Sequence, residues 1–458
     1  MSAIAFSEQD LTPHLGRIAA ALGPAAGLAY SPPHDYPMSV PFFDNTPCIE
    51  RTRPEFDKLR LYAHIPFCNY GCTYCFFAKR IGAGSDQMER YVKALKRELE
   101  WVEPGTPLSQ LFVGGGTPTA LSPELLNEVL TAIFSRMSCN NSEVHTVETS
   151  PESITEEHIR VLRDHNIGRI SMGIQSLDEN VLDTVNRRHS AEEALAACEL
   201  LVDAGFILNI DLIYGLPGQS HESFRRDLEI VTSRNIHAVT LYDLRVNERT
   251  PVTKAIEDEE RWNLSRLVNW RAFVKNAAEE LGFTQTRWHT FKRLDSIASR
   301  HERAPCFTDD GLGYQLGIGM SARSQLGYTV YRNNPHFNAY LERIETGNSP
   351  VEDTILLNEG DRKTQFVARS LGDGKPLDRT AYETAFGSSI DDDFGGAIER
   401  LRDNGVVDDD THRLYLTEIG KLVYDLVTVS FYPDHAFDWL HDREQSARTR
   451  GRLPISVD

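Results

Sequence analysis

The chain has 458 residues, a net charge of −19 at pH 7 and seven cysteines. The negative charge disfavours nucleic acid and anionic membrane as partners, because both need a positive surface, and no apolar run reaches the ~18 residues of a membrane-spanning helix. Early acidic residues, Glu8 and Asp10, argue against a secretory signal. Cysteines that are mostly scattered, in an odd total, suit a reducing cytosol, so we expect a cytoplasmic protein.

The N-terminal residues 1–55 carry no visible chemistry. Leu11–Leu22 has the apolar spacing of one amphipathic helix. Ser31–Pro37 is rich in proline and predicts an extended stretch. We therefore expect this region to form a packing arm.

The first motif is a cysteine triplet that follows a short predicted strand, Leu61–Ala63. Cys68, Cys72 and Cys75 have the spacing C-x3-C-x2-C. Three thiolates on one loop can hold three irons of a cubane iron–sulfur cluster and leave the fourth iron open to a small molecule. The alternative is structural zinc with His64 as the fourth ligand, but zinc sites usually combine two closely spaced pairs. The spacing favours a cluster.

From this point strands and helices alternate along the chain. The predicted elements, in order, are a helix capped by Ser85, strand Leu111–Val113, a helix capped by Ser122 with Pro123 at its first position, strand Val144–Glu148, a helix from near Thr155, strand Arg169–Gly173, a helix capped by Ser190 that Gly205 can end, strand Ile207–Tyr214, a helix from about Ser220, strand His237–Tyr242 and a helix near Glu259–Leu281. Six alternating strands predict a parallel sheet with functional groups at its carboxyl edge. The cysteine loop and the glycines after Val113 should share that edge.

The pattern changes after about residue 300. Gly311–Gly327 contains five glycines, and Asp361–Leu371 and Asp393–Leu401 look helical. A hairpin is predicted around Asp408–Asp410, with a last helix after Thr417. This order resembles a winged-helix module, although its acidic content argues against DNA binding.

Three further features suggest a ligand site. Gly114–Gly116 lets backbone amides approach a ligand, and amides before a helix suit a carboxylate or phosphate; a tight strand-to-helix turn is the alternative. Glu148 ends an apolar strand and can bind an amine or a ribose. Asp211 lies inside an apolar strand, which is costly without a partner. It either has a function or pairs with an arginine.

Taken together, these motifs resemble radical S-adenosylmethionine enzymes, specifically the oxygen-independent coproporphyrinogen III oxidase (HemN-like) group. The resemblance runs from about residue 56 to the C-terminus and rests on His64–Cys68 with the triplet, Gly114–Thr119, Glu148, Ser171–Gln175, Asn186–Arg187 and Asn209–Pro217. It implies an α/β fold: a partial (β/α)6 parallel barrel as the radical SAM core (56–300), after an N-terminal arm (1–55) and before a mostly helical, winged-helix-like C-terminal domain (301–458).

The resemblance also implies roles for individual residues. Cys68, Cys72 and Cys75 would ligate a [4Fe–4S] cluster, whose open iron would chelate S-adenosylmethionine. Reduction by a donor such as flavodoxin or ferredoxin would yield a 5′-deoxyadenosyl radical, in a chain that we expect to be a monomer. The residues expected to contact adenosylmethionine are Tyr62, Tyr74, Gly115, Gly116, Thr117, Glu148, Gln175, Arg187 and Asp211. Leu244 and Met320–Ser324 are expected to line a second cofactor and substrate site.

Three subtypes share this scaffold. The oxidase has a further cysteine two residues after the triplet, where this chain has Phe77. The haem chaperone, a binding protein, has a His-Asn-x-x-Tyr-Trp motif, whereas the nearby stretch here is His301–Cys306. Class C radical methyltransferases and cyclopropane-forming relatives share the phenylalanine and use two adenosylmethionines. The sequence favours this third subtype, with oxidase and chaperone as alternatives.

For that subtype, the predicted reaction is transfer of a methyl or methylene group to an sp2 carbon of a small aromatic or heterocyclic substrate. Tyr214, Tyr242 and Trp288 lie near predicted strand ends and either face such a substrate or belong to the core. A base must remove the final proton within hydrogen-bond reach. His289, Glu248 and Asp243 are the candidates.

Overall fold

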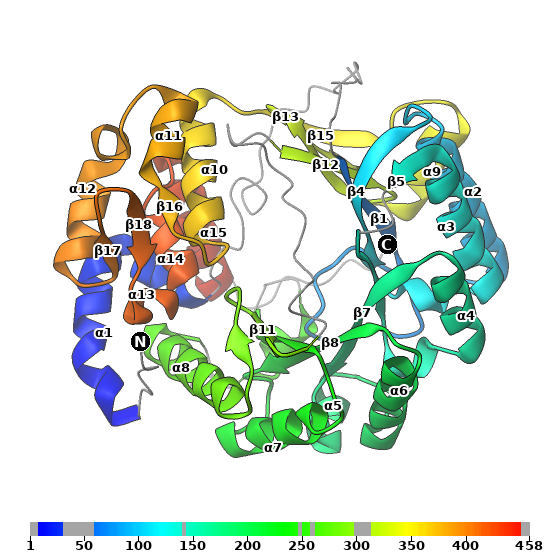
Figure 1. The fold of residues 1–458 in the computed structure, drawn as a ribbon, viewed down its shortest axis with the longest axis horizontal. Coiled ribbons are helices and arrows are strands. Elements are labelled where there is room, and N and C mark those ends of the chain that lie inside the picture. The colour runs from blue at the N-terminus through cyan, green and yellow to red at the C-terminus, as the bar shows by residue number, and fades with distance from the viewer. Residues whose placement is uncertain are drawn as a thin grey trace.

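A curved parallel sheet with helices on its outer face organises the molecule (Figure 1). The computed structural model describes residues 8–30, 59–139, 143–245, 250–256, 262–296 and 313–449. The six central strands are β1 (Leu59–Ile65), β4 (Thr106–Gly115), β6 (His145–Thr149), β7 (Ile167–Gln175), β8 (Ile207–Tyr214) and β9 (Ala238–Asp243). They pair in parallel in the order β9-β8-β7-β6-β4-β1. The predicted α/β fold with a six-stranded parallel core is confirmed.

Most of the helices on the outer face begin at the predicted caps. They are α2 (Ser85–Leu99), α3 (Pro123–Arg136), α4 (Glu156–Asp164), α5 (Glu179–Thr184), α6 (Ala191–Asp203) and α7 (His221–Thr232). The Ser122, Thr155, Ser190 and Ser220 side chains accept backbone N–H groups of the first turns. The prediction that Ser85 caps a helix is wrong, because Gly84 occupies the N-cap of α2 and makes no side-chain hydrogen bond.

The sheet is wider than predicted. β12 (Gly313–Ile318) pairs in parallel with β1, and the antiparallel strands β13 (Arg323–Gly327), β14 (Thr329–Asn333) and β15 (Val351–Leu356) extend that side. At the other end β11 (Thr290–Lys292) and β10 (Thr284–Gln285) add to β9. Glycine is unusual in strands. At Gly317 the reason for it is steric, because a Cβ there would lie 2.5 Å from the Arg323 carbonyl oxygen. The close approach of β12 and β13 therefore requires glycine there.

The C-terminal region is mostly helical around a small sheet, as predicted (Figure 1). Its strands β16 (Leu377–Asp378), β18 (Arg413–Leu416) and β17 (Val407–Asp409) pair in that order. Its helices are α10 (Glu359–Leu371), α11 (Arg379–Phe386), α12 (Ile390–Asp403), α13 (Glu418–Lys421), α14 (Tyr424–Val429) and α15 (Asp434–Thr449). The single last helix predicted after Thr417 is in fact α13, α14 and α15.

The N-terminal helix joins the two halves. α1 (Glu8–Leu22) packs against α8 (Leu264–Glu280) of the core and α12 of the C-terminal region (Figure 1). Arg400 of α12 donates from Nε to the Ala21 carbonyl oxygen at 3.0 Å. The predicted extended stretch Ser31–Pro37 lies outside the described residues. Among the helices that the structure describes, none is long and apolar enough to cross a membrane.

Candidate active site

The three clustered cysteines lie on the loop after β1. Cys68 ends the short strand β2 (Phe67–Cys68), which pairs with β3 (Arg80–Ile81), and Cys72 and Cys75 follow on the loop. All three are free thiols and half-buried. Burial and the neighbouring Cys75 and Cys72 raise the pKa of Cys68 to about 11, against the lowering effect of the Thr117 hydroxyl. The thiols of Cys72 and Cys75 therefore lie near enough to Cys68 to affect its ionisation.

His64 is not available as a zinc ligand. Its Nδ1 lies 2.9 Å from the Tyr62 hydroxyl and its Nε2 lies 3.0 Å from the Ala78 carbonyl oxygen. Burial lowers its pKa to about 4, so the ring is neutral. Within the described ranges, no three His, Cys, Asp or Glu side chains are grouped to hold a single metal ion. A cubane takes one thiolate per iron, so its cysteines need not converge on one point, and the site fits a cluster better than zinc.

The glycine turn is joined to the cysteine loop by backbone hydrogen bonds. Gly116 N donates to Ile65 O at 2.8 Å, and Thr117 N donates to Phe67 O at 2.8 Å. A Cβ at Gly116 would lie 2.7 Å from the Phe67 carbonyl oxygen, and one at Gly115 would lie 2.5 Å from the His64 ring. Gly115 also has a φ of 118°, which favours glycine. The two motifs thus share one edge of the sheet, as predicted.

Two carboxylates come from β6 and β8, the strands on either side of β7. Glu148 Oε2 accepts the Gly115 backbone N–H at 3.0 Å. Asp211 accepts from Ser171 Oγ at 3.1 Å and from Asn209 Nδ2 at 2.8 Å. A hydroxyl and an amide group therefore donate hydrogen bonds to Asp211, so an arginine is not its only polar partner.

The electrostatics of this pair depend on burial and on a nearby arginine. Burial and the charge of Asp211 raise the pKa of Glu148 to about 7. Burial raises the pKa of Asp211 to about 6, although the Arg169 guanidinium lowers it. Sequence reasoning gave Arg169 no role. The sequence feature that could have indicated its role is the position of this charged side chain near the start of an otherwise mostly apolar strand, β7.

We expect Glu148→Gln to change how stability depends on pH. The pKa of Glu148 is about 7 in the folded chain, above its usual 4.5. The protonated side chain therefore stabilises the folded state fully below pH 4.5, and this stabilisation is lost as the pH rises to about 7. A neutral amide avoids this loss. The unfolding free energy of the variant relative to wild type should rise by on the order of 2 kcal/mol between about pH 5.5 and about pH 8, measured by urea unfolding.

The control for this comparison is Glu89→Gln, a substitution of the same type at an exposed position on α2. It should leave the pH dependence as in wild type. A Glu148→Gln effect equal at both pH values would contradict an ionised, buried Glu148 at the higher pH.

Arg187 approaches the cluster loop from the segment after α5. Its Nη1 lies 3.6 Å from Cys72 Sγ, and its Nη2 donates to the Gly173 carbonyl oxygen. Its Nε is buried without a hydrogen-bond partner among the described residues. The guanidinium therefore retains a donor for a carboxylate, which suits the amino-acid end of adenosylmethionine. Tyr74 lies against the same Cys72 and Arg187.

The remaining predicted cofactor residues are spread along the edge. Tyr62 stacks on Phe112 with ring centroids 6.1 Å apart. Gln175 ends β7 with a φ of 73°. Leu244 is buried after β9, and its N–H donates to Tyr214 O at 3.0 Å. These three residues thus come from β1, the end of β7 and the position after β9.

The predicted wall at Met320–Ser324 is a turn between β12 and β13 together with the first two residues of β13. The Met320 backbone N–H donates to the Tyr91 hydroxyl of α2 at 3.0 Å. A Cβ at Gly319 would lie 2.7 Å from His64 O. Glu98 Oε2 accepts the Gly319 N–H at 2.8 Å, so the turn is held to α2, whose Tyr91 hydroxyl also donates to the His64 carbonyl oxygen of β1 at 2.7 Å.

The three predicted aromatic residues have different surroundings. Tyr214 is core: it is buried and stacks on Trp270 with centroids 5.8 Å apart. Trp288 stacks on Tyr424 of α14 at 4.6 Å. Of the three, Tyr242 is the one with a largely exposed side chain, at 38%.

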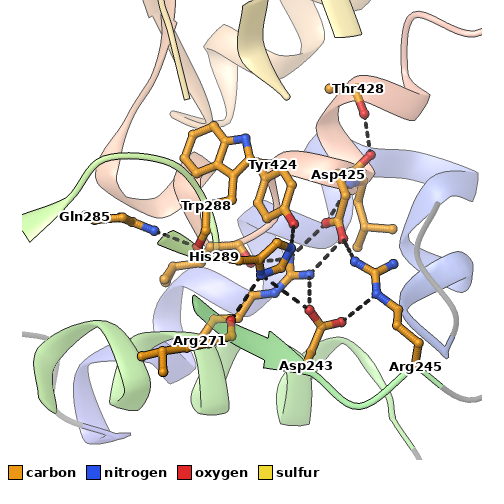
Figure 2. A network of polar contacts seen from close by, with 12 residues as sticks. Asp243, Arg245, Arg271, Gln285, Trp288, His289, Tyr424, Asp425 and Thr428 are labelled. Atoms are coloured by element: carbon orange, nitrogen blue, oxygen red, sulfur yellow. Dashed lines mark hydrogen bonds and ion pairs between the residues drawn. The ribbon is translucent and has the colours of Figure 1, made fainter. Parts of the chain in front are cut away.

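Two of the predicted bases belong to a buried network that joins the core to α14 (Figure 2). Asp243 pairs with Arg245 at 3.1 Å and with Arg271 at 3.6 Å. Arg271 in turn forms a two-pronged pair with Asp425, at 2.8 and 2.7 Å. Burial alone would raise the pKa of Asp425, but the Arg271 guanidinium holds it below the usual value.

His289 is also committed in this network. Its Nε2 is hydrogen-bonded to the Tyr424 hydroxyl and its Nδ1 lies 3.2 Å from Leu241 O. Burial lowers its pKa to about 4. His289 and Asp243 therefore serve the junction, and the structure gives neither the free position that a proton acceptor needs. Glu248 lies outside the described residues.

Comparison with known proteins defines the class first. The model of the Radical SAM superfamily matches residues 62–231. Members of this superfamily use a [4Fe–4S] cluster and S-adenosylmethionine, and these are the cofactors of this chain.

The nearer relatives then define the family. The chain is 30% identical over 309 residues to "Coproporphyrinogen III oxidase, anaerobic 1" of Cereibacter sphaeroides, covering 64% of this chain and 68% of the relative. It is 28% identical to "Heme chaperone HemW" of Lactococcus lactis, over 78% of this chain and 93% of the relative. The solved coproporphyrinogen III oxidase (HemN) of Escherichia coli superposes with a TM-score of 0.71 at 25% identity, over 82% and 91% of the two chains. The chain belongs to the HemN-like family of radical SAM enzymes.

Proposed function

We propose that this chain cleaves S-adenosylmethionine reductively and removes a hydrogen atom from a small organic substrate. The observation that carries this proposal is the contact between the cysteine loop, the glycine turn and Arg187 at one edge of the parallel sheet. When bound, the cluster and adenosylmethionine supply a 5′-deoxyadenosyl radical. The protein holds and orients these groups.

We assign the site residues as follows. Cys68, Cys72 and Cys75 hold the cluster, and the buried Nε–H of Arg187 is placed to bind a carboxylate. We assign the remaining contacts to residues at the edge that runs from β1 to β9: Tyr62, Tyr74, Gly115, Gly116, Thr117, Glu148, Gln175, Asp211 and Leu244. A flavodoxin or ferredoxin as donor, and a monomeric state, stay predictions.

For the reaction type, we place oxidative decarboxylation first. Relatives named as coproporphyrinogen III oxidases align over most of this chain, including one of Pseudomonas aeruginosa that is 26% identical over 86% of it. The sequence alone favours one-carbon transfer, and the names of these relatives give that reaction less support. The relatives named HemW make haem binding a further outcome to test. The stretch His301–Cys306, which lacks the chaperone motif, lies outside the described residues.

One-carbon transfer remains the second candidate because of Phe77. This side chain is 58% exposed and its ring centroid lies 4.7 Å from that of Phe76. It stands on the cysteine loop where the oxidase motif has another cysteine. A phenylalanine there cannot act as a thiol, so the chemistry next to the cluster differs from that of the oxidase.

An anaerobic product assay separates these reactions. With reductant, adenosylmethionine and a coproporphyrinogen substrate, we expect 5′-deoxyadenosine without S-adenosylhomocysteine. Equal amounts of both products, with an aromatic or heterocyclic acceptor, would instead establish one-carbon transfer. Tight haem titration without 5′-deoxyadenosine would contradict an enzymatic role and support a chaperone.

A further inference from the structure

The segment Val185–Arg188 is hydrogen-bonded to the cysteine loop. The Val185 carbonyl oxygen accepts the Thr73 N–H at 3.1 Å. Asn186 Nδ2 donates to the Gly71 carbonyl oxygen at 2.7 Å. Asn186 has a φ of 56°, a conformation that asparagine tolerates better than most residues. The backbone on both sides of Cys72 is therefore fixed by one short segment.

Arg187 occupies a defined position within this arrangement. One nitrogen of its guanidinium lies 3.6 Å from Cys72 Sγ and another is anchored on the Gly173 carbonyl oxygen. Its carbon Cζ lies 5.7 Å from the centroid of the Tyr70 ring. Contacts on three sides fix where the positive charge sits relative to the sulfur.

A fixed cation at a ligand sulfur affects the reduction of an iron–sulfur cluster. Gaining one electron adds one negative charge to the cluster, and the attraction between this charge and a cation a few ångströms away favours the reduced form. Hydrogen bonds to the sulfurs and the net charge around them set the reduction potential. Arginine keeps its charge at all accessible pH values.

We propose that Arg187 is a positioning residue that raises the reduction potential of the cluster through its contact with Cys72. This inference rests on the proposed ligation of the cluster by Cys72. It adds a role to the carboxylate contact proposed for Arg187, because it concerns the cluster before adenosylmethionine binds. The consequence is easier electron uptake from a low-potential one-electron donor.

The test is a potentiometric titration of the anaerobically reconstituted full chain, followed by the electron paramagnetic resonance of the reduced cluster, without adenosylmethionine. Arg187→Gln should lower the ratio of reduced to oxidised cluster about tenfold at a given potential, which is about 59 mV for one electron. Arg187→Lys keeps the charge and should stay within about threefold of wild type. The matched control is Arg188→Gln.

Arg188 is exposed and lies over the same Tyr70 ring, 5.5 Å from its centroid. Its removal changes the net charge equally and should leave the ratio within about twofold of wild type, because solvent screens an exposed charge. An equal shift in Arg187→Gln and Arg188→Gln overturns the proposal. If Arg187→Gln holds no four-iron cluster, Arg187→Lys decides: a wild-type potential supports the proposal and a tenfold fall overturns it.

A wrong assignment of the cysteines as cluster ligands gives a different result from a wrong role for Arg187. A wild-type chain that binds no four-iron cluster overturns the cysteine assignment and this inference together. A four-iron cluster whose potential does not respond to Arg187 overturns only the role of Arg187.

Discussion

Replacing Cys72 by alanine should abolish both cluster assembly and formation of 5′-deoxyadenosine. The loop provides three thiolates for three irons, and His64, the nearest alternative ligand, has both ring nitrogens engaged. With one thiolate removed, the loop keeps only Cys68 and Cys75, and His64 is not free to replace the third ligand. We expect iron to fall from four per chain to near zero and product formation to fall by more than about 100-fold. Iron and sulfide analysis of reconstituted protein, with product quantification, measures both.

The matched control is Cys139→Ala. Cys139 is an exposed free thiol on β5 (Met137–Cys139), a strand that pairs with the first residues of β4 rather than with the glycine end. This variant should keep four irons and full turnover. Retention of the cluster in Cys72→Ala, or zinc in place of iron in the anaerobically prepared wild type, would contradict the assignment of the site.

The parts of the fold that sequence predicted correctly depend on local signals. Ser122 and Ser190 predict where their helices begin, because the side chain of an N-cap residue accepts a hydrogen bond from the backbone of the first helical turn, a few residues away. Ile207–Tyr214 was predicted with its full length, because a buried strand in a parallel sheet reads as one apolar run. The same reasoning placed the cysteine loop and the glycine turn at one edge, since parallel strands end together.

The parts that sequence missed depend on contacts between distant residues. β12 and β13 were not predicted: only the glycine content of Gly311–Gly327 was noted, because the pairing of the two strands depends on the close approach of Gly317 to Arg323. For Tyr214 the sequence left substrate contact and core both open, and its stacking on Trp270 places it in the core. His289 was proposed as a base, but its partner Tyr424 lies 135 residues away. Local pattern carries no information about such partners.

Arg271→Met should lower the unfolding free energy by about 3–5 kcal/mol, because it removes the two-pronged partner of the buried Asp425 and leaves Arg245 as the arginine that pairs with both Asp425 and Asp243. Arg271 bonds to both oxygens of Asp425 and also lies 3.6 Å from Asp243. The side chain of Asp425 has no solvent exposure and that of Asp243 has 2%. Urea unfolding followed by tryptophan fluorescence measures the loss, and Trp288, stacked on Tyr424, reports directly on this junction.

Two further variants show whether burial of charge is the cause. Arg225→Met removes an exposed arginine that pairs with Glu229 and Glu280, and it should cost no more than about 1 kcal/mol. The double variant Arg271→Met/Asp425→Leu removes both members of the buried pair. It should regain much of the stability lost in Arg271→Met, because apolar residues often replace a buried ion pair at little cost. If Arg271→Met costs no more than Arg225→Met, the network in Figure 2 does not hold the C-terminal helices to the core.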